Sequence, residues 1–140
     1  MADYMKKKMT DNPLLFNGPV PAGFPSPASD YIEGRLDLNE YLVKHPAATF
    51  FVRASGDSMT GAGIFPGDIL IVDRALKPSD SSIVIASLNG EFTVKRLRIS
   101  DGKLSLVPEN KSYKPIEIHD DSDFRIWGVV THVIHKTCKP

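Results

Sequence analysis

The chain has 140 residues, of which 41% are hydrophobic and 24% charged, a composition typical of one globular domain. Its 17 basic residues balance 17 acidic ones, so no basic domain or stripe suggests strong direct DNA binding. Cys138 is the single cysteine, which excludes an intrachain disulfide, and no apolar run has the length of a signal sequence or membrane span. We therefore expect a cytoplasmic protein.

The first 30 residues contain repeated prolines, at positions 13, 19, 21, 25 and 27. Proline fixes φ and removes an amide donor, which disfavours both a helix and a central strand. We predict that residues 1–30 form an extended, partly mobile N-terminal arm and that residues 31–140 form one domain.

A short helical pattern follows over residues 38–43. Asp37 is placed to cap it, and Glu40 stands three residues later, as in a capping box. His45 precedes Pro46, and the residue before a proline disfavours the helical conformation, so the helix should end there.

The rest of the chain is typical of strands and turns. Asn89-Gly90 separates two β-rich runs, and Ser100-Asp-Gly precedes a third, so each indicates a hairpin. Gly128 within the last run suggests a bulge or bend. These patterns predict a compact, mainly β fold with one short helix and strands near residues 49–54, 68–73, 82–88, 91–99, 103–107 and 124–134.

Ser58 is a candidate nucleophile within Ala54-Ser-Gly-Asp-Ser-Met. Gly56 permits a sharp turn, after which a serine can project into a cleft with neighbouring amides directed at an oxyanion. Taken alone, the same composition is typical of an ordinary structural turn. A serine also needs a base, and none of the histidines, at positions 45, 119, 132 and 135, is well placed to serve.

Lys95 is the alternative base. Period-two alternation puts it on one face of its strand with Thr93, Leu97 and Ile99, where apolar neighbours would favour the neutral amine. A solvated face of an edge strand explains the same pattern. His132 and His135 lack cysteine partners for a zinc site, so we predict no metal and no cofactor.

Four ordered motifs together resemble a known family, the LexA-type self-cleaving Ser-Lys peptidases, and within it the UmuD group. The resemblance extends from about Gly23 to about His135. It is carried by the segments Phe24-Pro-Ser-Pro-Ala-Ser-Asp-Tyr, Ala54-Ser-Gly-Asp-Ser-Met, Gly67-Asp-Ile-Leu-Ile-Val-Asp and Gly90-Glu-Phe-Thr-Val-Lys-Arg-Leu.

The resemblance implies a LexA/signal-peptidase-like fold with Ser58 as nucleophile and Lys95 as its neutral base. Backbone amides at Ser58 and Met59 would form the oxyanion site. The family cleaves itself in the N-terminal arm between a small residue and glycine, which corresponds here to Ala22-Gly23. Prolines on both sides of that bond favour the extended chain that a protease cleft accepts.

The same resemblance implies a regulatory subunit for translesion synthesis in the SOS response. Its partners would be a second copy of the chain, the RecA filament on single-stranded DNA, and the error-prone polymerase subunit UmuC. Only 22 residues precede Gly23, too few for the helix-turn-helix domain of a LexA-type repressor. The rival interpretation is a non-catalytic, dimeric module that binds a polymerase. The apolar residues of the last strand would serve either the core or a dimer interface: Ile126, Trp127, Val129, Val130, Val133 and Ile134.

Overall fold

The computed structural model describes residues 11–16 and 32–138. The chain divides into two compact units, residues 1–42 and residues 43–140, which are described separately. The predicted mobility of the arm concerns residues that lie mostly outside the described ranges, and the predicted boundary near residue 30 stays a prediction.

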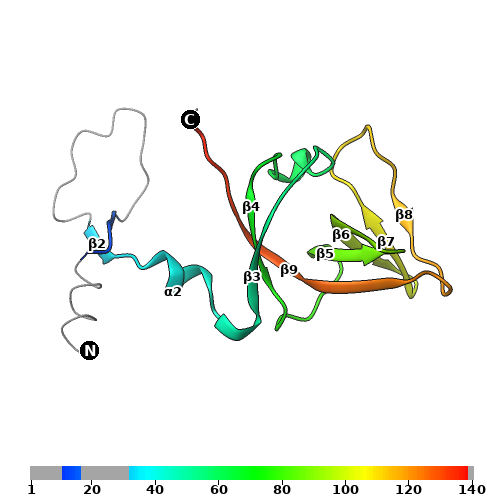
Figure 1. The fold of residues 1–140 in the computed structure, drawn as a ribbon, viewed down its shortest axis with the longest axis horizontal. Coiled ribbons are helices and arrows are strands. Elements are labelled where there is room, and N and C mark those ends of the chain that lie inside the picture. Colours follow the sequence, from blue (N-terminus) through cyan, green and yellow to red (C-terminus); the bar gives the residue numbers. More distant parts are fainter. Residues whose placement is uncertain (1–10, 17–31, 139–140) are drawn as a thin grey trace. The chain divides into compact units, whose positions relative to one another are not determined.

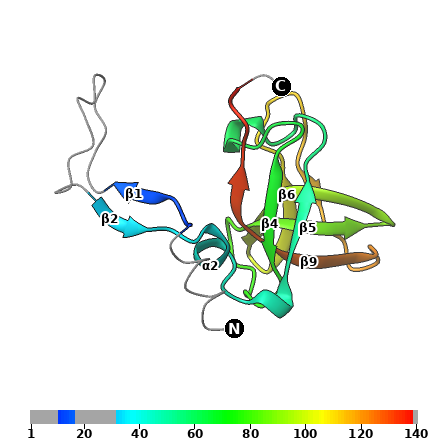
Figure 2. The same ribbon diagram turned by 60° about the vertical axis from the view of Figure 1, so that its left-hand side comes forward.

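The first unit contains a small strand pair and the predicted helix. Strand β1 (Leu14–Phe16) pairs antiparallel with β2 (Ile32–Arg35), as Figure 2 shows. Sequence analysis did not predict these strands, which have only three and four residues. Helix α2 (Leu38–Leu42) begins as expected, because the Glu40 amide donates a 3.2 Å hydrogen bond to Asp37 Oδ1.

The second unit is built on a seven-stranded antiparallel sheet in the order β3-β4-β9-β5-β6-β7-β8 (Figure 1). The mainly β fold predicted from the sequence is confirmed. Two single-turn 3-10 helices, η2 (Pro46–Ala48) and η3 (Thr60–Ala62), were not predicted. The strands are β3 (Thr49–Arg53), β4 (Ile69–Asp73), β5 (Ile83–Leu88), β6 (Glu91–Ser100), β7 (Lys103–Val107), β8 (Ile116–Glu117) and β9 (Phe124–Ile134).

Both predicted hairpins are present. Asn89 and Gly90 have φ values of 51° and 87°, and Asp101 and Gly102 have φ values of 52° and 74°. Two successive positive φ values are what the favoured two-residue hairpin turn requires, and Asn, Asp and Gly tolerate them best. These turns fix the β5–β6 and β6–β7 registers, and hence the position of Lys95.

Strand β9 joins the two halves of the sheet by pairing with β5 through its first part and with β4 through its second part (Figure 1). Its register with β5 shifts between the partners of Gly128 and Ile126, so the irregularity predicted near Gly128 is present. A Cβ on Gly128 would lie 2.6 Å from Cγ1 of Val72, so close packing requires glycine there.

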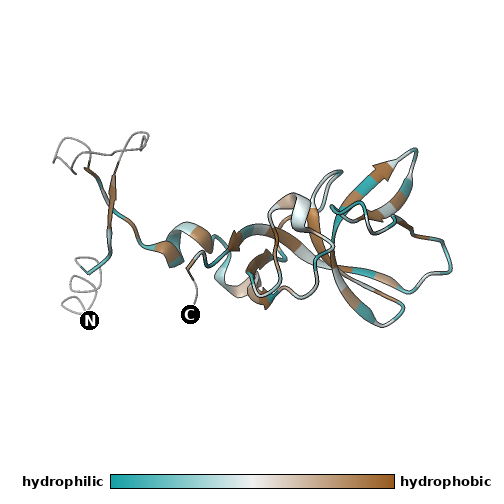
Figure 3. Cartoon of the chain, turned by 90° about the horizontal axis from the view of Figure 1, so that it is seen from above, coloured by the Kyte–Doolittle hydropathy of each residue, from teal (hydrophilic) through white to brown (hydrophobic). Residues whose placement is uncertain are grey.

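The sheet encloses two apolar clusters, and apolar residues recur along its strands in Figure 3. One cluster includes Met59, Leu70 and Val72, and the other includes Val84 and Leu97. Most of the apolar side chains of β9 pack against these clusters and so belong to the core, whereas Ile134 is 47% exposed. Within the described residues, no helix is long and apolar enough to cross a membrane.

Candidate active site

Ser58 lies on the connection between β3 and η3. Gly56 has φ of 76°, a left-handed conformation that turns the chain just before the serine. The connection is fixed at its two ends by buried apolar side chains, Ala54 and Met59. The Ala54 amide also donates a 2.8 Å hydrogen bond to Asp68 O. Ser58 is therefore presented on an anchored turn, half-buried at the sheet.

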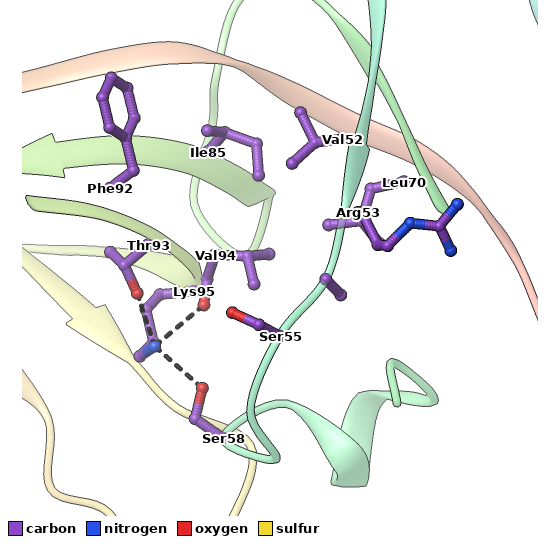
Figure 4. Close-up of a pocket in the computed structure, with 11 residues that line it drawn as sticks. Val52, Arg53, Ser55, Ser58, Leu70, Ile85, Phe92, Thr93, Val94 and Lys95 are labelled. Atoms are coloured by element: carbon purple, nitrogen blue, oxygen red, sulfur yellow. Dashed lines mark hydrogen bonds between the residues drawn. The ribbon is translucent and has the colours of Figure 1, made fainter. Parts of the chain in front are cut away.

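Lys95 extends from β6 directly to this serine (Figure 4). Its Nζ lies 2.9 Å from Ser58 Oγ, 2.7 Å from Thr93 Oγ1 and 3.1 Å from the carbonyl oxygen of Val94. Thr93 was expected only to share a face with Lys95, and its direct contact with Nζ was not predicted. The period-two spacing is the signal that would have indicated it, since residues i and i+2 of a strand point to one side.

The surroundings of Lys95 favour loss of its proton. Burial lowers the pKa of the Lys95 ammonium below its ordinary value, because removal from water disfavours the charged form. Within the described part of the chain, no carboxylate forms an ion pair with Lys95 to oppose this shift. At the same pH, a larger fraction of Lys95 is therefore neutral than of a free lysine.

A cleft of about 210 Å³ opens beside the two side chains (Figure 4). Its wall combines apolar and polar side chains, and Phe92 is 66% exposed at it. Period-two alternation by itself would put Phe92 and Val94 on the face opposite Lys95, yet both line the same cleft. The cleft is bounded by residues from β3, β4, β5 and β6 and from the Ser58 turn: Val52, Arg53, Ala54, Ser55, Ser58, Leu70, Ile85, Phe92, Thr93, Val94 and Lys95.

Two backbone amides at this turn are available to an incoming group. Among the described residues, no acceptor takes a hydrogen bond from the amide of Ser58 or of Met59. The Ser58 carbonyl oxygen, in contrast, accepts a 2.9 Å hydrogen bond from the Glu109 amide. The carbonyl side of the turn is thus occupied, while the amide side retains its donors.

The histidines lie elsewhere. His45 Nδ1 is 2.6 Å from Asp73 Oδ2, and His135 Nδ1 is 2.6 Å from Asp68 Oδ1, so both are structural partners of buried carboxylates. In residues 11–16 and 32–138, no three His, Cys, Asp or Glu side chains gather in a possible metal site. Ala22 and Gly23 fall outside the described residues.

The family model described as Peptidase S24-like matches residues 13–131. The chain belongs to this family. It is similar to Protein SamA of Salmonella typhimurium, with 52% identity over 88% of this chain and 85% of SamA. It is also similar to Protein ImpA of Escherichia coli, with 51% identity over 88% of this chain and 83% of ImpA.

The LexA repressor of Xylella fastidiosa is 41% identical over 80% of this chain and 53% of the repressor. The resemblance predicted from the four motifs is thereby confirmed, and the mainly β fold agrees with it. Membership in the Peptidase S24-like family supports a serine peptidase of the self-cleaving kind. The assignment of roles to individual residues stays a prediction.

Proposed function

We propose that the chain cleaves its own Ala22-Gly23 bond, with Ser58 as nucleophile and Lys95 as general base. One observation carries the proposal: Lys95 Nζ lies 2.9 Å from Ser58 Oγ beside an open cleft, with the pKa of Lys95 lowered by burial. Hydrogen-bond reach and a base poised to be neutral are the two requirements for activating a serine.

The reaction proceeds through an acyl-enzyme. Neutral Lys95 removes the Ser58 hydroxyl proton while Oγ attacks the carbonyl carbon of Ala22. The resulting tetrahedral oxyanion accepts hydrogen bonds from the Ser58 and Met59 amides. When the bond between the Ala22 carbonyl carbon and the Gly23 nitrogen breaks, the Lys95 ammonium returns its proton to that nitrogen. Water then releases Ala22 from Ser58, again with Lys95 as base.

The consequence of the cut is a change in binding. The shortened form, residues 23–140, acts as a dimer with an error-prone polymerase subunit of the UmuC type in the SOS response. The RecA filament on single-stranded DNA promotes the cut by favouring the conformation in which residues 22 and 23 occupy the cleft, a shift of population that adds no catalytic group. The similarity to SamA and ImpA supports this assignment over a repressor.

Cleavage of the purified chain is the first test. At alkaline pH, or with RecA, single-stranded DNA and a nucleotide cofactor, we expect loss of a fragment comprising residues 1–22, identified by mass spectrometry. Ser58→Ala and Lys95→Ala should each abolish cleavage, a loss of at least about 1000-fold. Ser100→Ala and Lys103→Ala are matched controls, because both side chains are exposed at the β6–β7 turn.

Protein that stays intact under both treatments would exclude the peptidase and leave the non-catalytic polymerase-binding module. Cleavage that survives Ser58→Ala or Lys95→Ala would reassign the nucleophile or the base. A cut at a bond other than Ala22-Gly23 would retain the dyad but change its substrate.

A further inference from the structure

The loop after β7, residues 108–113, is held by hydrogen bonds against the turn that carries Ser58. The Glu109 amide donates a 2.9 Å hydrogen bond to Ser58 O, and the Gly61 amide donates a 2.7 Å hydrogen bond to Glu109 O. Glu109 thus contacts the backbone of the nucleophile itself and of a residue three positions later. These two backbone hydrogen bonds hold the turn against the loop.

Gly61 shows how close this contact is. A Cβ at position 61 would lie 2.5 Å from the carbonyl oxygen of Glu109, so any side chain there would force the two segments apart. Asn110 adds a further connection, because its Nδ2 donates a 2.9 Å hydrogen bond to Asp57 O. The Tyr113 hydroxyl donates to Asp57 Oδ1, and this contact raises the pKa of Tyr113.

The Glu109 side chain connects the same loop to the strand of the base. Its carboxylate accepts a hydrogen bond from Arg96 Nε, and Arg96 is the residue after Lys95 on β6. Arg96 is fixed in turn by a 2.7 Å hydrogen bond from Nη1 to Ser81 O. The side chains of Arg96 and Glu109 are 24% and 32% exposed, so the pair is partly shielded from water.

We propose that Arg96 and Glu109 are positioning residues that set the distance between Ser58 and Lys95. The ion pair joins a β6 residue adjacent to the base to a residue whose backbone holds the nucleophile. This inference rests on the proposed self-cleavage. Misplacement of a reacting group by about 1 Å can lower a rate about 100-fold, so a pair that never touches substrate can still control the reaction.

The rate test compares Arg96→Gln, Glu109→Gln and the double variant with Arg98→Gln. Arg98 is the matched control: it lies two residues further along β6 and pairs at 3.9 Å with Asp80, and both side chains are exposed. We expect each single variant at position 96 or 109 to cleave at least about tenfold more slowly. Arg98→Gln should stay within about twofold of the native rate. The double variant should match the slower single variant, because the two residues act as one unit.

The pH dependence separates positioning from a change in the base. The apparent pKa of the cleavage rate should be unchanged in Arg96→Gln and Glu109→Gln, with only the plateau rate lowered. Equal slowing by Arg98→Gln, a native rate in both variants, or fully additive losses in the double variant would each overturn the proposal.

Amide hydrogen exchange tests the same contacts without any cleavage. In the Ser58→Ala background, Arg96→Gln should accelerate exchange of the Gly61 and Glu109 amides, and Arg98→Gln should not. If the native chain does not cut itself, the proposed function fails but this measurement still decides whether the pair holds the turn. Unchanged exchange at both amides would exclude the positioning role.

Discussion

At the scale of single residues, the three neighbours of Lys95 Nζ match the needs of a neutral amine. A neutral amine has two N–H groups and one lone pair. In that form, the Val94 carbonyl oxygen accepts one N–H and the Thr93 hydroxyl oxygen accepts the other. The lone pair of Nζ can then accept a hydrogen bond from the Ser58 hydroxyl. In the proposed mechanism, the Ser58 hydroxyl would donate its proton to this lone pair.

The cleavage rate should therefore rise with pH. Because burial lowers the pKa of Lys95, the rising limb should have an apparent pKa below the ordinary lysine value of 10.5. Lys95→Arg should be inactive at every pH, since a guanidinium does not lose its proton in proteins. Initial rates of cleavage between about pH 7 and 11 measure both effects. A rate independent of pH over that range would contradict a lysine base.

Sequence analysis singled out Ser58 and Lys95, which the structure brings within hydrogen-bond reach, but not the other residues that contact them. Period-two alternation correctly grouped Thr93 with Lys95. Glu109 carried no such signal, because its contacts with Ser58 and Gly61 depend on where a distant loop folds back. Contacts of this kind are set by tertiary structure, which local spacing does not encode.

At the scale of elements, a buried carboxylate stands at each end of β4. Burial of Asp68 opposes its ionisation, but hydrogen bonds from the Phe65 amide and His135 outweigh that effect, and the pKa of Asp68 is lowered. The same balance applies to Asp73. Burial opposes its charge, yet hydrogen bonds with His45 and the Ala75 amide lower its pKa. Both carboxylates thus hold neighbouring loop residues at the ends of β4 through hydrogen bonds.

Acid should therefore destabilise the fold through these pairs. A folded-state pKa below the unfolded value of 3.8 gives stability that is present above about pH 4 and is lost as the pH falls through the lower, folded value. Asp68→Asn should reduce the unfolding free energy at pH 7 by about 1.5–3 kcal/mol, the range for a hydrogen bond to a charged group. It should also flatten the acid dependence.

Urea unfolding of both proteins at pH 7 and pH 3 provides the measurement. Asp80→Asn is an exposed control, expected to show a smaller change at pH 7. Equal acid sensitivity in Asp68→Asn and the native chain would show that other carboxylates control the transition.

The longer strands could be predicted from their own residues, whereas the short strands could not. β4 and β5 are runs of β-branched and apolar residues, and Asn89-Gly90 specified the turn after β5. β1 and β8 have three and two residues and exist only through pairing with β2 and β7. Leu14–Phe16 follows a proline and has no alternating pattern, so nothing local distinguished it from the rest of the arm.

At the scale of the whole molecule, the sequence indicated a proline-rich segment followed by a mainly β domain, and the family assignment agrees with the second part. It did not indicate that Leu14–Phe16 in the first part pairs with Ile32–Arg35 beyond it. Phe16 pairs with Ile32, so the proposed scissile bond lies in the connection between two hydrogen-bonded strands. The pairing includes a 2.9 Å hydrogen bond from the Leu36 amide to Pro13 O.

After the cut, the fragment comprising residues 1–22 should leave the rest of the chain. Among the described residues, three residue pairs join β1 to β2, and an isolated two-stranded pair is marginal in water. Native mass spectrometry or size-exclusion chromatography of the cleaved protein at micromolar concentration should detect the fragment free. A fragment that stays bound at that dilution would mean that other contacts retain it.

The proposed cut would consequently be one-way, because the β1–β2 pair is too small to retain the released fragment. While the chain is intact, the connection keeps the two strands at an effective concentration of the order of millimolar, whatever the amount of protein present. Hydrolysis converts that fixed value into the actual concentration of a released peptide, which dilution drives toward zero. The reverse reaction would then require two separate molecules to meet. At low protein concentration, the proposed cut would therefore not be reversed.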